Sequence, residues 1–251
     1  MLGRIIVLLY AACCLILASS CSTSVRYKSD YTNYINPNSS IAILPSKTEV
    51  NVVDLSCQKT RMYDYELFLE KVISEAIALE LREHNVNASV VTRKEIHDQT
   101  LNADFESIID NASQIIASAY VKEKKKNLTW RTTKNRDSVI SENLECDLAE
   151  FRKKIKTDII AVVEYNHISK TNGARIKDII IDTALQTQST PSDHMSFVIA
   201  FIDVKTGDFL WSNVITSASG VRSRTREPNR IQYFVKKLLL PLFKSKTYPK
   251  T

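Results

Sequence analysis

The sequence of 251 residues contains only four glycines and six prolines. So few glycines argue against a glycine-rich phosphate-binding loop, and so few prolines argue against low-complexity linkers. The four histidines lack the spacing of a metal site, and no nucleophile-elbow motif surrounds any serine. We therefore expect no metal, no cofactor and no catalytic constellation, and we expect that the chain is not an enzyme.

An uncharged apolar run follows a single basic residue at the N-terminus. The run covers residues 5–18, which is shorter than the roughly 18–20 residues of a membrane-spanning helix. The run leads into Ala-Ser-Ser directly before Cys21, which resembles the lipobox of bacterial lipoproteins. This pattern predicts residues 1–20 as a signal peptide and Cys21 as the lipidated residue. Secretory cleavage without lipid is the alternative.

Ser22 stands where lipoproteins retained in the inner membrane commonly carry Asp. The sequence therefore favours an outer-membrane anchor through Cys21, with the chain facing the periplasm. Residues 21–40 are rich in Ser, Asn and Tyr with little apolar periodicity, and they predict a flexible tether. Residues 41–251 then form a single domain, because 44% hydrophobic and 25% charged residues are typical of a globular protein.

The N-terminal half of the domain alternates strand and helix patterns. A short apolar run, residues 41–45, predicts a buried strand, and residues 51–62 suggest a loop. The segment 64–84 has a broad apolar helical face and precedes a second strand, residues 88–91. A strand, a helix and a second strand in this order predict a parallel pair. Further elements are expected at 92–95 (a capping box), 104–125 and 144–156 (helices), and 159–163 (a central strand).

The C-terminal third indicates an antiparallel meander. Residues 179–185 alternate between two faces and predict a strand. Residues 195–204 and 209–216 predict a hairpin that turns at Gly207. A closing amphipathic helix is expected over residues 230–243. The fold class is therefore α/β, a mixed sheet with an N-terminal parallel β-α-β part, a C-terminal antiparallel meander, and helices packed on the sheet.

Three sequence motifs resemble those of a superfamily of envelope lipoproteins: residues 41–45 (IAILP), 90–96 (VVTRKEI) and 201–211 (FIDVKTGDFLW). The superfamily includes the curli-secretion channel lipoprotein, the N-terminal domain of the Tol β-propeller protein, a lipoprotein activator of a penicillin-binding cell-wall synthase, and exopolysaccharide-export lipoproteins. These relatives mostly bind partners or form rings. The resemblance therefore implies protein partners in the envelope and a possible homo-oligomer. Within the motif of residues 201–211, we interpret Asp203, Gly207 and Trp211 as turn and packing residues.

Two cysteines remain in the domain, Cys57 and Cys146. They could pair in the oxidising periplasm, and two free thiols are the alternative. A basic excursion is expected near residues 122–141, and a second basic loop follows residue 217. Each of these segments is expected to be either a solvated loop or a binding site for an anionic partner. Such a partner would be lipid, cell wall or an acidic protein rather than nucleic acid. The candidate residues are Lys124, Lys125, Lys126, Arg131, Arg222, Arg224 and Arg226.

The sequence thus predicts a non-enzymatic structural or adaptor subunit of an envelope-spanning assembly, either a secretion system or the cell-wall synthesis machinery. The alternative is an envelope hydrolase that uses His194 with Asp193 or Cys57. A ring-forming channel is disfavoured, because the excursion over residues 126–141 is too polar for a membrane-inserting hairpin.

Overall fold

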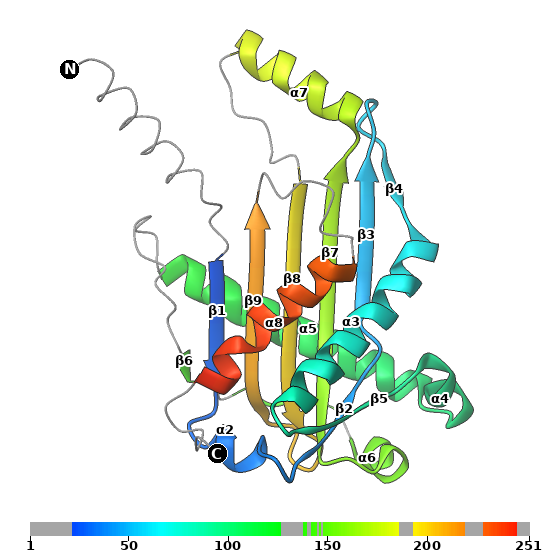
Figure 1. The fold of residues 1–251 in the computed structure, drawn as a ribbon, viewed down its shortest axis with the longest axis vertical. Coiled ribbons are helices and arrows are strands. Elements are labelled where there is room, and N and C mark those ends of the chain that lie inside the picture. Colours follow the sequence, from blue (N-terminus) through cyan, green and yellow to red (C-terminus); the bar gives the residue numbers. More distant parts are fainter. Residues whose placement is uncertain are drawn as a thin grey trace, which may run out of the picture.

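The computed structural model describes residues 22–126, 138–139, 142–144, 146, 148–185, 193–218 and 228–244. Within these residues one mixed sheet of nine strands forms the centre of the molecule (Figure 1). Its main path is β4-β3-β7-β8-β9-β1-β6, and β2 joins it beside β7 and carries β5. The strands are β1 (Ser22–Tyr27), β2 (Ser40–Ile43), β3 (Lys47–Val53), β4 (Lys59–Arg61), β5 (Asn87–Val90), β6 (Ser138–Val139), β7 (Ile159–Lys170), β8 (Asp193–Asp203) and β9 (Phe209–Ala218).

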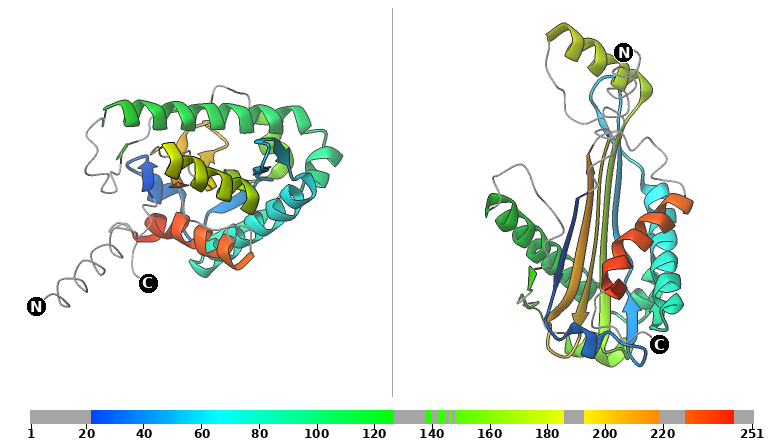
Figure 2. Two further views of the ribbon diagram at one scale, coloured as in Figure 1. Left: turned by 90° about the horizontal axis from the view of Figure 1, so that it is seen from above. Right: turned by 60° about the vertical axis from the view of Figure 1, so that its left-hand side comes forward.

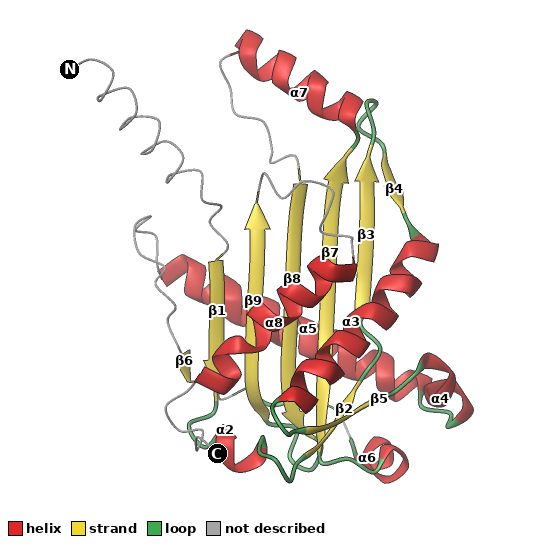
Figure 3. Ribbon diagram, in the orientation of Figure 1, coloured by secondary structure: helices red, strands yellow, loops and turns green. Residues whose placement is uncertain are grey.

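Helices cover both faces of this sheet (Figures 2 and 3). One face carries α3 (Tyr63–Glu83) and α8 (Pro228–Lys244), which lie side by side, and the other carries α5 (Asn102–Lys126). The shorter helices are α2 (Tyr31–Tyr34), α4 (Arg93–Asp98), α6 (Ala149–Ile155) and α7 (Asn172–Leu185). Figure 1 shows α7 standing beyond the C-terminal end of β7, away from the other helices.

Two hydrophobic clusters lie on opposite faces of the sheet. On β7, Ala161 and Val163 belong to the α3 and α8 side, and Ile160 and Val162 belong to the α5 side. The side chains of a strand alternate between faces, so a strand covered on both sides is apolar throughout. The expected α/β fold with a mixed sheet is therefore confirmed.

The parallel part has the expected partners. Strand β2 pairs in parallel with β5, with α3 between them in the chain, and also with β7. The capping box is confirmed, because Thr92 Oγ1 accepts from the Glu95 amide at 3.2 Å and Glu95 Oε2 accepts from the Thr92 amide at 2.6 Å. This backbone hydrogen bond from Thr92 lowers the pKa of the Glu95 carboxyl.

The meander is present, but the prediction of its first strand over residues 179–185 is wrong. It consists of β7, β8 and β9, paired antiparallel. Residues 179–185 form the second half of helix α7 instead of a strand. The apolar run there fits either period, and β7 already supplies the strand beside β8 over eleven residue pairs from Ile159 to Ser169.

The prediction of a flexible tether is also wrong. Ser22–Tyr27 is strand β1, which pairs antiparallel with β9 and parallel with β6. Val25, Tyr31 and Ile35 are all buried in the cluster under α8, and the Tyr31 hydroxyl donates to the Leu242 carbonyl at 3.3 Å. The segment is ordered because a few apolar side chains contact elements far along the chain, which local composition does not reveal.

Two further boundaries differ from expectation. Residues 51–62, expected as a loop, contain most of the β3–β4 hairpin. Strand β3 is ordered by its parallel pairing with β7 from Lys47 to Val53. The third expected helix begins at Ala149 instead of residue 144, because Asn143 and Leu144 bond the β8–β9 hairpin: Asn143 through a bridge to Asp208, and Leu144 through its amide to the Gly207 carbonyl.

Candidate functional site

The β8–β9 hairpin, which carries the FIDVKTGDFLW motif, is a structural turn built around Gly207. Gly207 has φ +77°, and its amide donates to the Asp203 carbonyl at 2.8 Å. The Asp203 side chain accepts from the Lys205 amide at 2.8 Å. Trp211 is buried, with its ring centroid 5.7 Å from that of Phe201. The interpretation of these residues as turn and packing residues is confirmed.

Two distant residues hold this hairpin. Asn143 donates from Nδ2 to the Thr206 carbonyl at 2.6 Å and to Asp208 Oδ1 at 2.9 Å. Lys28, directly after β1, donates from Nζ to Asp208 Oδ2 at 3.0 Å. The hydrogen bond from Asn143, followed by the Lys28 ammonium, lowers the pKa of the Asp208 carboxyl. Asp208 therefore stays ionised at neutral pH and joins three parts of the chain.

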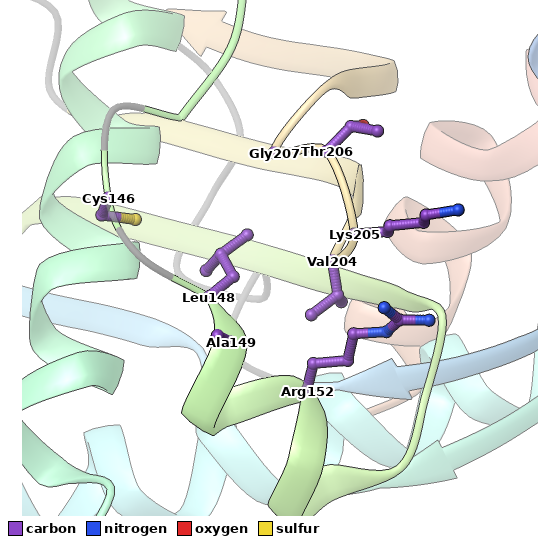
Figure 4. A pocket seen from close by; sticks show the side chains of 8 residues that line it. All are labelled: Cys146, Leu148, Ala149, Arg152, Val204, Lys205, Thr206 and Gly207. Atoms are coloured by element: carbon purple, nitrogen blue, oxygen red, sulfur yellow. The ribbon is translucent and has the colours of Figure 1, made fainter.

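A pocket of about 250 Å³ lies between this hairpin and the first turn of α6 (Figure 4). Leu148 and Val204 lie centrally, Arg152 and Lys205 extend on one side, and the Cys146 thiol lies on the other. Arg152 reaches Asp158 across 3.7 Å, and both side chains are largely exposed. Basic groups beside an apolar centre suit an acidic or C-terminal segment of a partner. The described lining residues include no carboxylate or imidazole that could act as a general base.

A second cluster lies at the opposite end of the sheet, where β3 and β7 end. The exposed Cys57, with φ +65°, sits in the β3–β4 turn, and its Sγ lies 3.7 Å from Lys177 Nζ on α7. His194, at the start of β8, is exposed and stands opposite Ile168 in the register. Within the described residues the Cys57 thiol thus contacts an ammonium group, whereas the Cys57 form of the hydrolase alternative requires the His194 imidazole there.

The candidate disulfide between Cys57 and Cys146 is not formed, and both residues are reduced cysteines. Cys57 lies beyond Val53, which pairs with Lys170 at the C-terminal end of β7. Cys146 lines the pocket at the other end of β7. The twelve residues of β7 span about 40 Å, whereas a disulfide needs Cα atoms within about 7 Å.

The remaining candidates divide between described and undescribed residues. Lys124, Lys125 and Lys126 occupy the end of α5, so the expected excursion begins in a helix. Cys21, Arg131, Arg222, Arg224 and Arg226 lie outside the described residues. Across the described ranges, no three His, Cys, Asp or Glu residues are grouped to hold a metal ion. No helix within these ranges is long and apolar enough to cross a membrane.

The outer surfaces of α3 and α8 expose large apolar side chains. On α3, Phe68 is 46% exposed and Leu79 is 53% exposed; on α8, Tyr233 is 54% exposed and Leu240 is 37% exposed. Phe68 and Leu79 are eleven residues apart, and Tyr233 and Leu240 are seven apart, so each pair lies along one side of its helix. The sequence pattern does not predict this surface, because the broad apolar face of residues 64–84 places Phe68 on the core-facing side, whereas the structure exposes it.

Sequence reasoning also missed the pocket. Arg152 and Lys205 are far apart in the sequence and come together only because α6 packs beside the β8–β9 turn. The motif of residues 201–211 does indicate an exposed position for Lys205, since it predicts a hairpin turn there. No comparable signal pointed to Arg152 or to Asn143.

Comparison with solved structures finds similar folds at low identity. The PelC dodecamer from Paraburkholderia phytofirmans aligns in two crystal forms. One form, a single-substitution variant, has a TM-score of 0.40 at 9% identity over 89% of this chain and 98% of that chain. The other has a TM-score of 0.38 at 9% identity over 88% of this chain and 96% of that chain.

A PDZ domain protein from Parabacteroides distasonis aligns with a TM-score of 0.40 at 12% identity, over 91% of this chain and 36% of that chain. No protein-family model and no curated protein matches the sequence. Because all three TM-scores are below 0.5, these likenesses carry no argument about function or assembly. Membership of the envelope lipoprotein superfamily stays a prediction.

Proposed function

We propose that the chain is a lipid-anchored, non-enzymatic adaptor that docks other envelope proteins in the periplasm through the outer surfaces of α3 and α8. The observation that carries the proposal is the exposure of Phe68, Leu79, Tyr233 and Leu240 on two neighbouring helices. Large apolar side chains exposed on neighbouring helices favour a protein interaction surface. This surface lies on the helices, so the sheet beneath can hold it rigidly.

The anchor of this adaptor is Cys21. The lipobox-like Ala-Ser-Ser-Cys sequence supports acylation at this residue, and Ser22 supports sorting to the outer membrane. Acyl chains contribute about 0.8 kcal/mol for each buried methylene, so two or three chains hold a protein on a bilayer. The assembly served is a secretion system or the cell-wall synthesis machinery, as the resemblance implies.

The pocket beside the β8–β9 hairpin supports the same role. Arg152 and Lys205 offer positive charge to an acidic partner segment, with Leu148 and Val204 supplying apolar contact. An adaptor with both a helical surface and a pocket can hold two proteins at once. Neither feature depends on bond-making chemistry.

The test is crosslinking in intact cells that express the tagged full chain, followed by purification in detergent and mass spectrometry. We expect a stoichiometric set of envelope proteins that is lost with Cys21→Ala and strongly reduced with Leu79→Glu and Tyr233→Glu. Gln114→Glu, an exposed position on α5 across the sheet, is the matched control and should leave the set unchanged.

Two results would contradict the proposal. One is an unchanged partner set in both α3 and α8 variants; the other is a protein without acyl mass on Cys21. Recovery of only the chain itself, in a defined oligomer disrupted by Leu79→Glu, would reassign the same surface to self-assembly.

A further inference from the structure

We propose that the end of the sheet formed by α7 and the β3–β4 hairpin rests against the phospholipid headgroups of the membrane that holds Cys21. The occupant of this surface is a bilayer, not a protein. The inference rests on the proposed function in one respect, because it takes the lipid anchor at Cys21 as given. It adds the orientation of the domain and a second membrane contact.

Almost no chain separates the lipid anchor at Cys21 from the folded domain. Strand β1 starts at Ser22, the residue after Cys21, and Ser22 is already paired with Thr216 of β9. One residue spans at most about 3.6 Å. A lipid on Cys21 therefore has no spacer and holds this end of the sheet at the bilayer.

The register shows which other elements share this end. Ser22 is in one row with Thr216, Ser196 and Asn166, across β9, β8 and β7. Strand β7 continues from Asn166 to Lys170, about 13 Å further, and lies three strand spacings, about 14 Å, from β1. The end of the sheet therefore rises in steps towards α7 (Figure 1). A plane inclined by roughly 45° to the strands passes through Ser22 and Lys170. Helix α7 and the β3–β4 turn lie beyond Lys170 and therefore reach further towards the bilayer than the end of the sheet does.

The α7 end is a built unit rather than a loose appendage. The Thr171 amide donates to the Val53 carbonyl at 2.9 Å, and Lys177 Nζ donates to the Leu55 carbonyl at 3.2 Å. Leu55 lies over the first turn of α7, since a Cβ added to Gly173 would be 3.7 Å from Leu55 Cδ1. The hairpin and the helix therefore present a common surface.

The chemistry of this surface suits headgroups. Leu55 is 55% exposed and Ile176 is 59% exposed, on the hairpin and on α7 respectively. Lys59 and Arg61 on β4 are exposed; Lys59 Nζ pairs with Glu49 at 3.3 Å and Arg61 Nε with Glu66 at 3.0 Å. Lys177 lies between hairpin and helix. Apolar side chains that enter the interface, flanked by basic groups that meet lipid phosphates, are the usual composition of a monotopic contact.

The two native thiols provide the test, because Cys57 lies in this surface and Cys146 lies at the far end of the sheet. The mature lipoprotein is reconstituted in phosphatidylethanolamine–phosphatidylglycerol vesicles containing a lipid spin-labelled near the headgroup. One sample carries an environment-sensitive fluorophore on Cys57 with Cys146→Ser, and the matched sample carries it on Cys146 with Cys57→Ser. We expect a blue shift and quenching at Cys57 and neither at Cys146.

A pair of substitutions tests the contact itself. Leu55→Glu with Ile176→Glu should reduce the Cys57 quenching by about half or more, because two carboxylates are then forced towards headgroup phosphates. Leu79→Glu on α3 should leave it unchanged. Vesicle-bound, acylated protein whose two fluorophores respond alike overturns the membrane contact but leaves the proposed anchor intact. Protein that does not float with vesicles and lacks acyl mass overturns the anchor, and with it both proposals.

Discussion

Lys28 Nζ lies 3.0 Å from Asp208 Oδ2, which joins the end of β1 to the β8–β9 turn across 180 positions of the chain. Asp208→Asn removes this ion pair and weakens the bond from Asn143 Nδ2 to Asp208 Oδ1. Both side chains of the pair are about a third exposed, so solvent screens the attraction. We expect a loss of about 0.5–1 kcal/mol in the free energy of unfolding at pH 7, measured by urea denaturation.

The pH dependence of this loss follows from the lowered pKa of Asp208. A carboxyl with a lower pKa in the folded state stabilises the fold fully above its unfolded pKa, about 3.9, and loses that contribution as pH falls through the folded pKa. The wild-type and Asp208→Asn proteins should therefore converge in stability as pH falls below about 3.9. A difference that stays constant down to pH 2 would refute the ionic role.

Gly207 and Gly173 provide a matched pair of alanine substitutions. At Gly207, with φ +77°, a Cβ would lie 3.0 Å from Asn143 Oδ1 and 3.1 Å from the Leu144 carbonyl. We expect Gly207→Ala to destabilise the fold by about 1–2 kcal/mol or more, because an L side chain is strained there. Gly173→Ala, with ordinary contacts in helix α7, should be neutral or stabilising by up to about 1 kcal/mol. Urea midpoints for the two variants give the comparison, and equal midpoints would contradict this geometry.

A substitution at Ile35 tests how much the segment before β2 contributes to the stability of the core. It is fully buried, so Ile35→Ala should cost about 2–4 kcal/mol by calorimetry or denaturant. The control is Ile176→Ala, at a side chain that is 59% exposed, where a change within about 0.5 kcal/mol is expected. If residues 22–40 were a flexible tether, both substitutions would be silent.

The absence of a bond between Cys57 and Cys146 leads to a redox prediction. Because these two cysteines are not joined in a disulfide, dithiothreitol should not change the urea midpoint of the mature protein. A disulfide closing so long a loop would contribute about 3–5 kcal/mol, which reduction would remove. Thiol titration of the unfolded, unreduced protein should find both groups reactive, and a blocked pair would place the cysteines within bonding distance.

Elements with a long, strong pattern could be predicted from the sequence. Helix α8 buries Ile231, Phe234, Val235, Leu238, Leu239 and Leu242 as its periodicity predicts. The sequence also predicts helix α3 and the capping box of α4, because the residues that define each of them lie close together in the chain. Such local agreement between pattern and structure is the usual situation for amphipathic helices.

The errors share a different cause, since they concern elements ordered by remote partners. Strand β1 is mostly polar and becomes a strand because β9 and β6 pair with it. Strand β3 depends in the same way on β7. The candidate surfaces could not be predicted from the sequence for a related reason. The exposure of Leu79 or Tyr233, and the proximity of Arg152 to Lys205, depend on how the elements pack in the folded chain.

The pairing of β1 with β9 makes the order of folding depend on the end of the chain. Tyr31 bonds to Leu242 across 211 positions, and β1 pairs with β9 over six residues from Ser22 to Tyr27, whereas its pairing with β6 involves only two. Contacts of such high sequence separation slow folding, because loop entropy is lost before they form. During synthesis from the N-terminus, β1 therefore lacks its main partner until residues 209–218 have been made.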